Sequence, residues 1–146
     1  MRTDNALGPQ PGLGDVPRLL EGMTSAGLPA ELVVEGEVRK LPPGVDLSAY
    51  RVIQEALTNS LRHSRDARAA VVLRYLPDAI DIVVTDDGRA VPSGDARGFG
   101  LLGMRERVAL FGGSFEAGPR AGGGFGVHVT LPRGEGAGDA AARARV

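Results

Sequence analysis

The segment Gln54–Ser64 carries a polar face whose residue types suit a metal-bound polyphosphate. Read as a helix at about 100° per residue, it brings Glu55, Asn59 and Arg62 within an arc of roughly 60°. An amide oxygen can ligate Mg²⁺, a carboxylate can hold a water molecule, and a guanidinium can pair with phosphate. For this helix in isolation, an ordinary solvated face is the better interpretation, so the function depends on what the rest of the chain adds.

Asp86 is the second candidate, because it ends an apolar run and is followed closely by Gly88. A carboxylate buried at the end of a strand needs a hydrogen-bond donor as its partner. The exocyclic amine of adenine would supply one. As an isolated motif, however, Asp-Gly is more typical of a β-turn.

The third candidate is the glycine-rich segment 98–103, which matches the letters of the dinucleotide fingerprint G-x-G-x-x-G. Its context argues against that fingerprint, because the polar residues 89–97 separate it from the nearest strand. The acidic ribose partner is also missing, since residues 122–124 are glycines. Glycines just before a helix leave backbone N–H groups free to surround phosphate oxygens. A role in turns alone explains this segment about as well.

The composition excludes several classes of protein. The 146 residues are most simply one domain, and a net charge of −1 provides no general attraction to nucleic acid or acidic membranes. The absence of cysteine excludes disulfides and thiolate metal sites. No apolar run approaches the ~18 residues of a membrane helix, and the N-terminus lacks the apolar core of a signal peptide. We therefore expect a cytoplasmic domain that contacts neither nucleic acid nor membrane, whether or not a longer parent is membrane-anchored.

Alternating helical and strand patterns must position these residues. Apolar residues from Val16 to Met23 have helical spacing, with Asp15 as the expected N-cap and Gly27 as the stop. The order along the chain then predicts helices that cover one face of a mixed sheet, an α+β two-layer sandwich with about three helices. Further helices are expected at 46–64 and 101–111, a loop at 86–100, and strands at 31–38, 69–75, 80–85, 114–117 and 126–131.

The two ends of the chain are expected to lie outside this domain. Residues 1–13 contain paired proline and glycine, which predicts a linker. Residues 134–146 are small and charged, which predicts a disordered tail. The folded domain is thus expected to span residues 14–133.

In this order, the motifs resemble the ATP-binding catalytic domain of two-component sensor histidine kinases, most closely the subfamily of nitrate and desaturase-regulating sensors. The family's hallmark helix, Glu-x-x-x-Asn-x-x-(Arg/Lys)-His, is matched by Glu55, Asn59, Arg62 and His63. Residues 86–88 resemble the first glycine box, 98–107 the second, and 122–132 the terminal box. Motifs in the family's order are far more specific than any one of them.

The resemblance implies a Bergerat-type fold that holds ATP and Mg²⁺. Asn59 would ligate the metal, with Glu55 as the other catalytic residue, and Asp86 would accept from the adenine amine. Residues 89–97 would form a short mobile lid over the nucleotide. The remaining residues that the resemblance assigns to the nucleotide are Arg62, His63, Gly88, Gly98, Gly100, Leu101 and Gly103. Two departures from the family pattern, Ala90 and Phe125, stand where glycine and threonine are usual.

The implied activity is transfer of the γ-phosphoryl group to a histidine on a separate dimerisation domain of the same sensor, which then serves a response regulator. Only His63 and His128 are present, and neither has the sequence context of the acceptor. His63 would have a supporting role near the phosphates or lid, and His128 none. The isolated domain is expected to be a monomer.

Other functions remain open at this point. An ATPase like gyrase, mismatch-repair or chaperone ATPases would use Glu55 to activate water, but their longer lids and transducer domain are missing. A stand-alone anti-sigma-factor serine kinase would suit the length, although Arg62, His63 and the wording of residues 98–107 argue against it. A nucleotide-sensing or dimerising module without catalysis is the non-enzymatic alternative.

Overall fold

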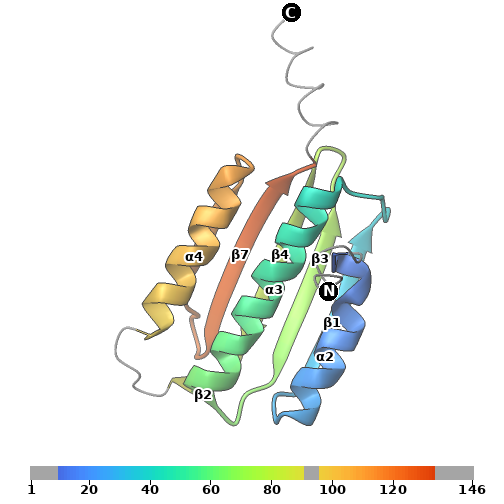
Figure 1. Ribbon diagram of the computed structural model, residues 1–146. Coiled ribbons are helices and arrows are strands. Elements are labelled where there is room, and N and C mark those ends of the chain that lie inside the picture. The colour runs from blue at the N-terminus through green and yellow to red at the C-terminus, as the bar shows by residue number, and fades with distance from the viewer. Residues whose placement is uncertain (1–9, 91–95, 134–146) are drawn as a thin grey trace, which may run out of the picture.

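The computed structural model describes residues 10–90 and 96–133, in which three α-helices lie on one face of a five-stranded sheet (Figure 1). The helices are α2 (Val16–Ser25), α3 (Pro43–His63) and α4 (Ala96–Leu110), and a short 3₁₀ helix, η1 (Leu13–Asp15), precedes α2. The sheet contains β1 (Ala30–Gly36), β3 (Ala69–Tyr75), β4 (Ala79–Asp86), β6 (Ser114–Pro119) and β7 (Phe125–Pro132). The short strands β2 (Ser64–Arg65) and β5 (Arg89–Ala90) pair with each other.

The sheet is mixed, in the order β1-β3-β4-β7-β6. β1 is parallel to β3, and the other neighbours are antiparallel. This confirms the predicted α+β two-layer sandwich. Because β4 lies in the middle of the sheet beneath α3, the end of β4 and the end of α3 come together.

Alternation along the strands builds the core. On β4, Ile80, Ile82 and Val84 are at most 2% exposed and face the helices. On α3, Ile53 and Leu57 are fully buried against them. Burying side chains of this size stabilises the fold by about 1.5–3 kcal/mol each. Tyr50 and Leu61, which lie on the same helix, are only partly buried.

One predicted boundary was wrong in a way that affects the site. α4 begins at Ala96 rather than Leu101, so Gly98 and Gly100 belong to the helix and not to a loop before it. Glycine weakens a helix by about 1 kcal/mol relative to alanine, but packing against a neighbouring element can outweigh that propensity. The helix expected at 46–64 begins earlier, at Pro43, because proline is well suited to the first turn.

The start of the described chain packs on α3. Leu13 is buried, and its N–H donates to Asp46 Oδ1 at 2.9 Å. Asp15 occupies the N-cap position of α2 as predicted, but its carboxylate accepts from the N–H of Gly12 at 2.9 Å instead of capping the helix. The predicted tail, 134–146, lies outside the described residues.

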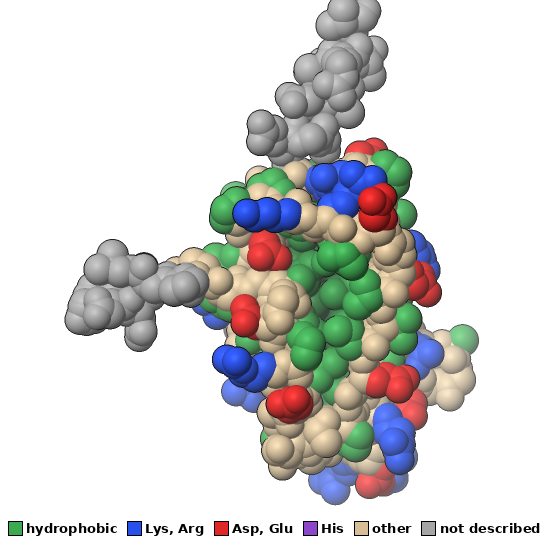
Figure 2. Space-filling view, turned by 90° about the vertical axis from the view of Figure 1, so that its right-hand side faces the viewer, with side chains coloured by type: hydrophobic (Ala, Val, Ile, Leu, Met, Phe, Trp, Pro, Cys, Tyr) green, Lys and Arg blue, Asp and Glu red, His purple; other side chains and the backbone are tan. Residues whose placement is uncertain are grey.

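β1 forms one edge of the sheet, with α2 beside it. Figure 2 shows hydrophobic side chains gathered in a hollow on this side of the molecule, and Leu20, Ala30 and Leu32 line it. Glu31 and Glu35 flank the apolar run of the strand, residues 32–34, and charges of this kind limit edge-to-edge pairing. Within residues 10–90 and 96–133, no helix has the length and apolarity needed to span a bilayer.

Candidate functional site

Asp86 lies at the end of β4 with only 1% of its surface exposed. Its Oδ2 accepts a 2.6 Å hydrogen bond from Ser60 Oγ of α3, and its Oδ1 accepts from the Gly88 N–H at 3.0 Å. Ser64 Oγ is farther away, at 3.3 Å from Oδ1 and 3.4 Å from Oδ2. The bonds from Ser60 and Ser64 make this carboxylate part of a buried hydrogen-bond network, and the bond from the Gly88 N–H, two residues on, is that of an Asx turn.

Two glycines keep the backbone close around Asp86. A Cβ added at Gly88 would lie 2.6 Å from the Cβ of Ala67, so only glycine fits between β4 and the β2 segment. Gly124 has φ +92° and packs directly on the Asp86 carbonyl. Arg120 donates from Nη1 to the same carbonyl at 3.1 Å. The terminal box, residues 122–132, therefore reaches Asp86 through the glycines at its start.

Asn59, Glu55 and Gly100 form the other half of the site. A Cβ added at Gly100 would lie 2.7 Å from Glu55 Oε2 and 3.1 Å from Asn59 Nδ2. Asn59 is 6% exposed, and its buried Nδ2 has no hydrogen-bond partner among the described residues. A buried polar atom without a partner is costly unless something else supplies the bond. The absence of a side chain at Gly100 thus lets α4 close on a pair of polar groups that remain available.

These groups fit Mg²⁺ in their chemistry. Mg²⁺ prefers oxygen ligands, keeps several waters, and is usually held by one or two protein groups together with substrate phosphates. Glu55 supplies a carboxylate, and the amide of Asn59 supplies an oxygen when it is rotated so that Oδ1, in place of the unpartnered Nδ2, faces the ligand. In the described residues, no cluster of three or more His, Cys, Asp or Glu could hold a metal.

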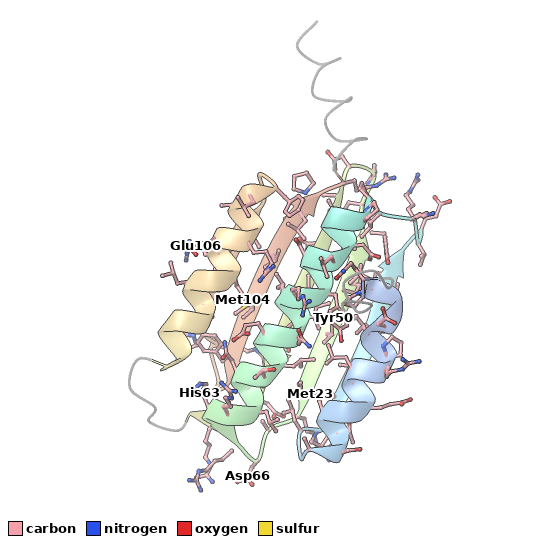
Figure 3. The ribbon with its side chains drawn as sticks, in the orientation of Figure 1. Met23, Tyr50, His63, Asp66, Met104 and Glu106 are labelled. Carbon is pink, nitrogen blue, oxygen red and sulfur yellow. The ribbon has the colours of Figure 1, made fainter. Side chains whose placement is uncertain are left out.

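Arg62 and His63 differ in their exposure to solvent. Arg62 is exposed, whereas His63, the last residue of α3, is 5% exposed (Figure 3). Along this face of α3, Glu55 is half-buried, Asn59 is buried and Arg62 is exposed. The predicted trio shares a helix face, and the structure brings two of its members, Glu55 and Asn59, against Gly100 of α4.

A cleft of about 540 Å³ runs between α3 and α4 and includes Glu55 and Gly100 in its lining. Gly103 also lines it, and Met104 is buried between the two helices (Figure 3). Leu101 lies in the same turn of α4 and is half-buried. Of the predicted lid, Arg89 and Ala90 form β5, Ala96 and Arg97 begin α4, and 91–95 lie outside the described residues.

Ser60 joins the two halves, because it follows Asn59 directly and contacts Asp86. Our sequence reasoning missed Ser60, Ser64 and Arg120. The signal for the two serines was their spacing of one helical turn beside Asn59. Arg120 carries no such signal, because only the fold brings it to Asp86.

Comparison with known proteins agrees with this geometry. The family model described as "Histidine kinase-, DNA gyrase B-, and HSP90-like ATPase" matches residues 44–135. "Sensor histidine kinase LnrJ" of Bacillus subtilis (strain 168) is 39% identical over 89 residues, which cover 61% of this chain and 22% of LnrJ. The chain therefore spans about a fifth of the length of this relative.

Two solved structures share the fold. The blue-light activated histidine kinase of Erythrobacter litoralis EL346 matches with a TM-score of 0.62 and 22% identity, over 84% of this chain and 42% of that one. Full-length ShkA, in complex with AMPPNP, matches with a TM-score of 0.66 and 16% identity, over 82% of this chain and 29% of that one.

Proposed function

The chain belongs to the histidine kinase-, DNA gyrase B- and HSP90-like ATPase family, and on that premise we propose that it binds Mg-ATP as the catalytic domain of a sensor histidine kinase. The observation that carries this proposal is the link from Asn59 through Ser60 to Asp86. Through this link, the buried Asn59 amide, whose Nδ2 has no partner among the described residues, is held near the buried Asp86 carboxylate. Asn59 can serve the phosphate end of a nucleotide, and Asp86 can serve its base.

Each residue has a role that follows from its surroundings. Asp86, held by Ser60 and Gly88, accepts from the adenine amine, and Asn59 and Glu55 face the phosphates. The early N–H groups of α4 add the positive end of a helix dipole, which favours an anion. Asn59 would hold Mg²⁺, and the ion would supply positive charge against the phosphates. Transfer then depends mainly on positioning and electrostatics.

The phosphoryl acceptor in this proposal is a histidine on another domain. His63 is buried within the nucleotide helix, so it is poorly placed for in-line attack. His128 lies on the sheet face away from the helices, between the inward-facing Val127 and Val129, and its Nε2 is 2.8 Å from Asp81 Oδ1. The separate dimerisation domain of the same sensor would supply the acceptor, and a response regulator would receive the group from it.

The names of the relatives favour a kinase over the other members of this family. LnrJ is named a sensor histidine kinase, and the EL346 kinase and ShkA share the fold of this chain. ShkA is in complex with AMPPNP, which supports an ATP-like ligand here. We propose a cytoplasmic location and a monomeric state for the isolated chain.

Labelling with γ-³²P ATP tests this proposal. The chain alone should acquire no acid-labile label, and it should transfer label when a dimerisation domain bearing an acceptor histidine is added in trans. Stoichiometric label on this chain alone, removed by His63→Ala or His128→Ala, would make that histidine the acceptor and contradict the separate-domain proposal. Steady phosphate release without any transfer would point to an ATPase.

A further inference from the structure

The carboxylate of Asp86 is contacted by two serines in unequal ways. Ser60 Oγ lies 2.6 Å from Oδ2, whereas Ser64 Oγ lies 3.3 Å from Oδ1 and 3.4 Å from Oδ2. A hydroxyl that donates to a carboxylate typically does so at about 2.5–2.7 Å. The Ser60 bond is therefore strong, and the Ser64 bond is weak and shared between both oxygens.

The positions of the serines explain this difference. Ser60 lies inside α3 and is 6% exposed, so its hydroxyl is confined beside Asp86. Ser64 follows the last residue of α3 and is only part-buried. It packs beside Gly88, where an added Cβ would lie 3.0 Å from the Cβ of Ser64. The hydroxyl of Ser64 can consequently rotate toward a ligand while losing only a weak bond.

The acceptor capacity of Asp86 leaves room for a base. A carboxylate has about four acceptor positions on its two oxygens. Ser60 and the Gly88 N–H take one position each, and rotation of Ser64 frees the rest. An exocyclic amine can then donate to Asp86. In adenine, the ring atom next to that amine is N1, an acceptor, which a carboxylate cannot satisfy.

Resting on the proposed function, we propose that Ser64 is a second base-reading residue. Its hydroxyl turns from Asp86 to donate to N1 of adenine, while Asp86 accepts from the N6 amine. Ser60 is a positioning residue, because it acts on the base only by holding the Asp86 carboxylate. Guanine presents a carbonyl where Asp86 needs a donor and an N–H in place of N1, so the Asp86 contact is lost and the Ser64 hydroxyl has to accept instead of donate.

Calorimetric titration with Mg-ATP and Mg-1-deaza-ATP, in which C–H replaces N1, tests this assignment. The wild-type chain should bind the analogue roughly three- to tenfold more weakly, as expected for one neutral hydrogen bond. Ser64→Ala should lose a similar factor for ATP and nothing for the analogue. Ser60→Ala should weaken both nucleotides by the same factor.

Ser48→Ala is the matched control. Ser48 is a buried serine of α3, 4% exposed, and it lies more than three helical turns before Ser60. It should change neither affinity. If Ser64→Ala lowers the affinity for both nucleotides equally, Ser64 has a merely structural role and the inference is overturned. The inference is also overturned if the wild type binds both nucleotides equally well. If the wild type binds no Mg-ATP, the proposed function itself fails. Circular dichroism confirms folding, and Ser64→Ala decides the question even if Ser60→Ala does not fold.

Discussion

Gly100 of α4 packs so closely on Asn59 of α3 that a Cβ there would lie 3.1 Å from Asn59 Nδ2. The same Cβ would lie 2.7 Å from Glu55 Oε2, a distance that a real Cβ does not adopt. Gly100 therefore leaves room for the side chains of Glu55 and Asn59 where α3 faces α4. Gly100 thus affects nucleotide binding through the positions of Glu55 and Asn59.

Gly100→Ala should displace Glu55 and weaken both the fold and the binding of Mg-ATP. Glu55 Oε2 is the far end of a flexible, half-buried side chain that can move aside, so the loss of stability should lie near the lower end of the ~1–3 kcal/mol typical of overpacking. Gly22→Ala is the control, because Gly22 is an exposed glycine of α2 with nothing within 4 Å of an added Cβ. That change should stabilise the chain by up to about 1 kcal/mol. Urea unfolding and calorimetry measure both effects, and similar stabilities for the two variants would contradict the packing argument.

Asn59→Ala should weaken Mg-ATP binding at least tenfold, about 1.4 kcal/mol, without lowering stability. The buried Nδ2 has no partner among the described residues, so removing the amide sacrifices no hydrogen bond at that atom. When EDTA removes Mg²⁺, the wild type and the variant should bind ATP alike. A tenfold difference that persists without the metal would mean that Asn59 contacts the nucleotide directly.

Asp86→Asn should reduce the preference for ATP over GTP. The wild type should favour ATP by about 2–4 kcal/mol, because a buried acceptor discriminates strongly between an amine and a carbonyl. Asparagine can offer an N–H where the adenine amine needs an acceptor. Competition between labelled ATP and unlabelled GTP measures the ratio, and comparable affinities in the wild type would exclude Asp86 as the reader of the base.

Asp81 should make the stability of the fold depend on pH. Burial raises the pKa of this carboxyl, but hydrogen bonds from Thr130 and His128, with the charges of His128 and Arg74, outweigh it and lower the pKa overall. A lowered pKa in the folded state means that Asp81 stabilises the fold above its unfolded pKa of about 4, and that this contribution is lost as pH falls through the folded value.

Asp81→Asn should therefore destabilise the chain at pH 7, and the deficit should shrink below about pH 4. Asp78→Asn, at an exposed residue between β3 and β4, is the control and should have little effect at either pH. Urea midpoints at both pH values give the comparison. A deficit that is equally large in acid would show that the side chain acts through packing and not through its charge.

The sequence was sufficient for the fold class and for one face of the site. Glu55 and Asn59 are one helical turn apart, and Asp86 ends an apolar run, so local periodicity placed each of them on its element. The start of α4 was misjudged because glycine content indicates a loop, whereas the contact of Gly100 with α3 is what makes glycine suitable inside this helix.

Only the tertiary structure decided how these elements share one site. The bond from Ser60 to Asp86 joins α3 to β4, and Arg120 reaches the Asp86 carbonyl from beyond β6. Such contacts depend on which strand lies beneath which helix, and hydrophobic periodicity specifies faces without specifying partners. The sequence by itself therefore determined which residues face inward, whereas the stacking of α3 over β4 and against α4 determined which of them meet.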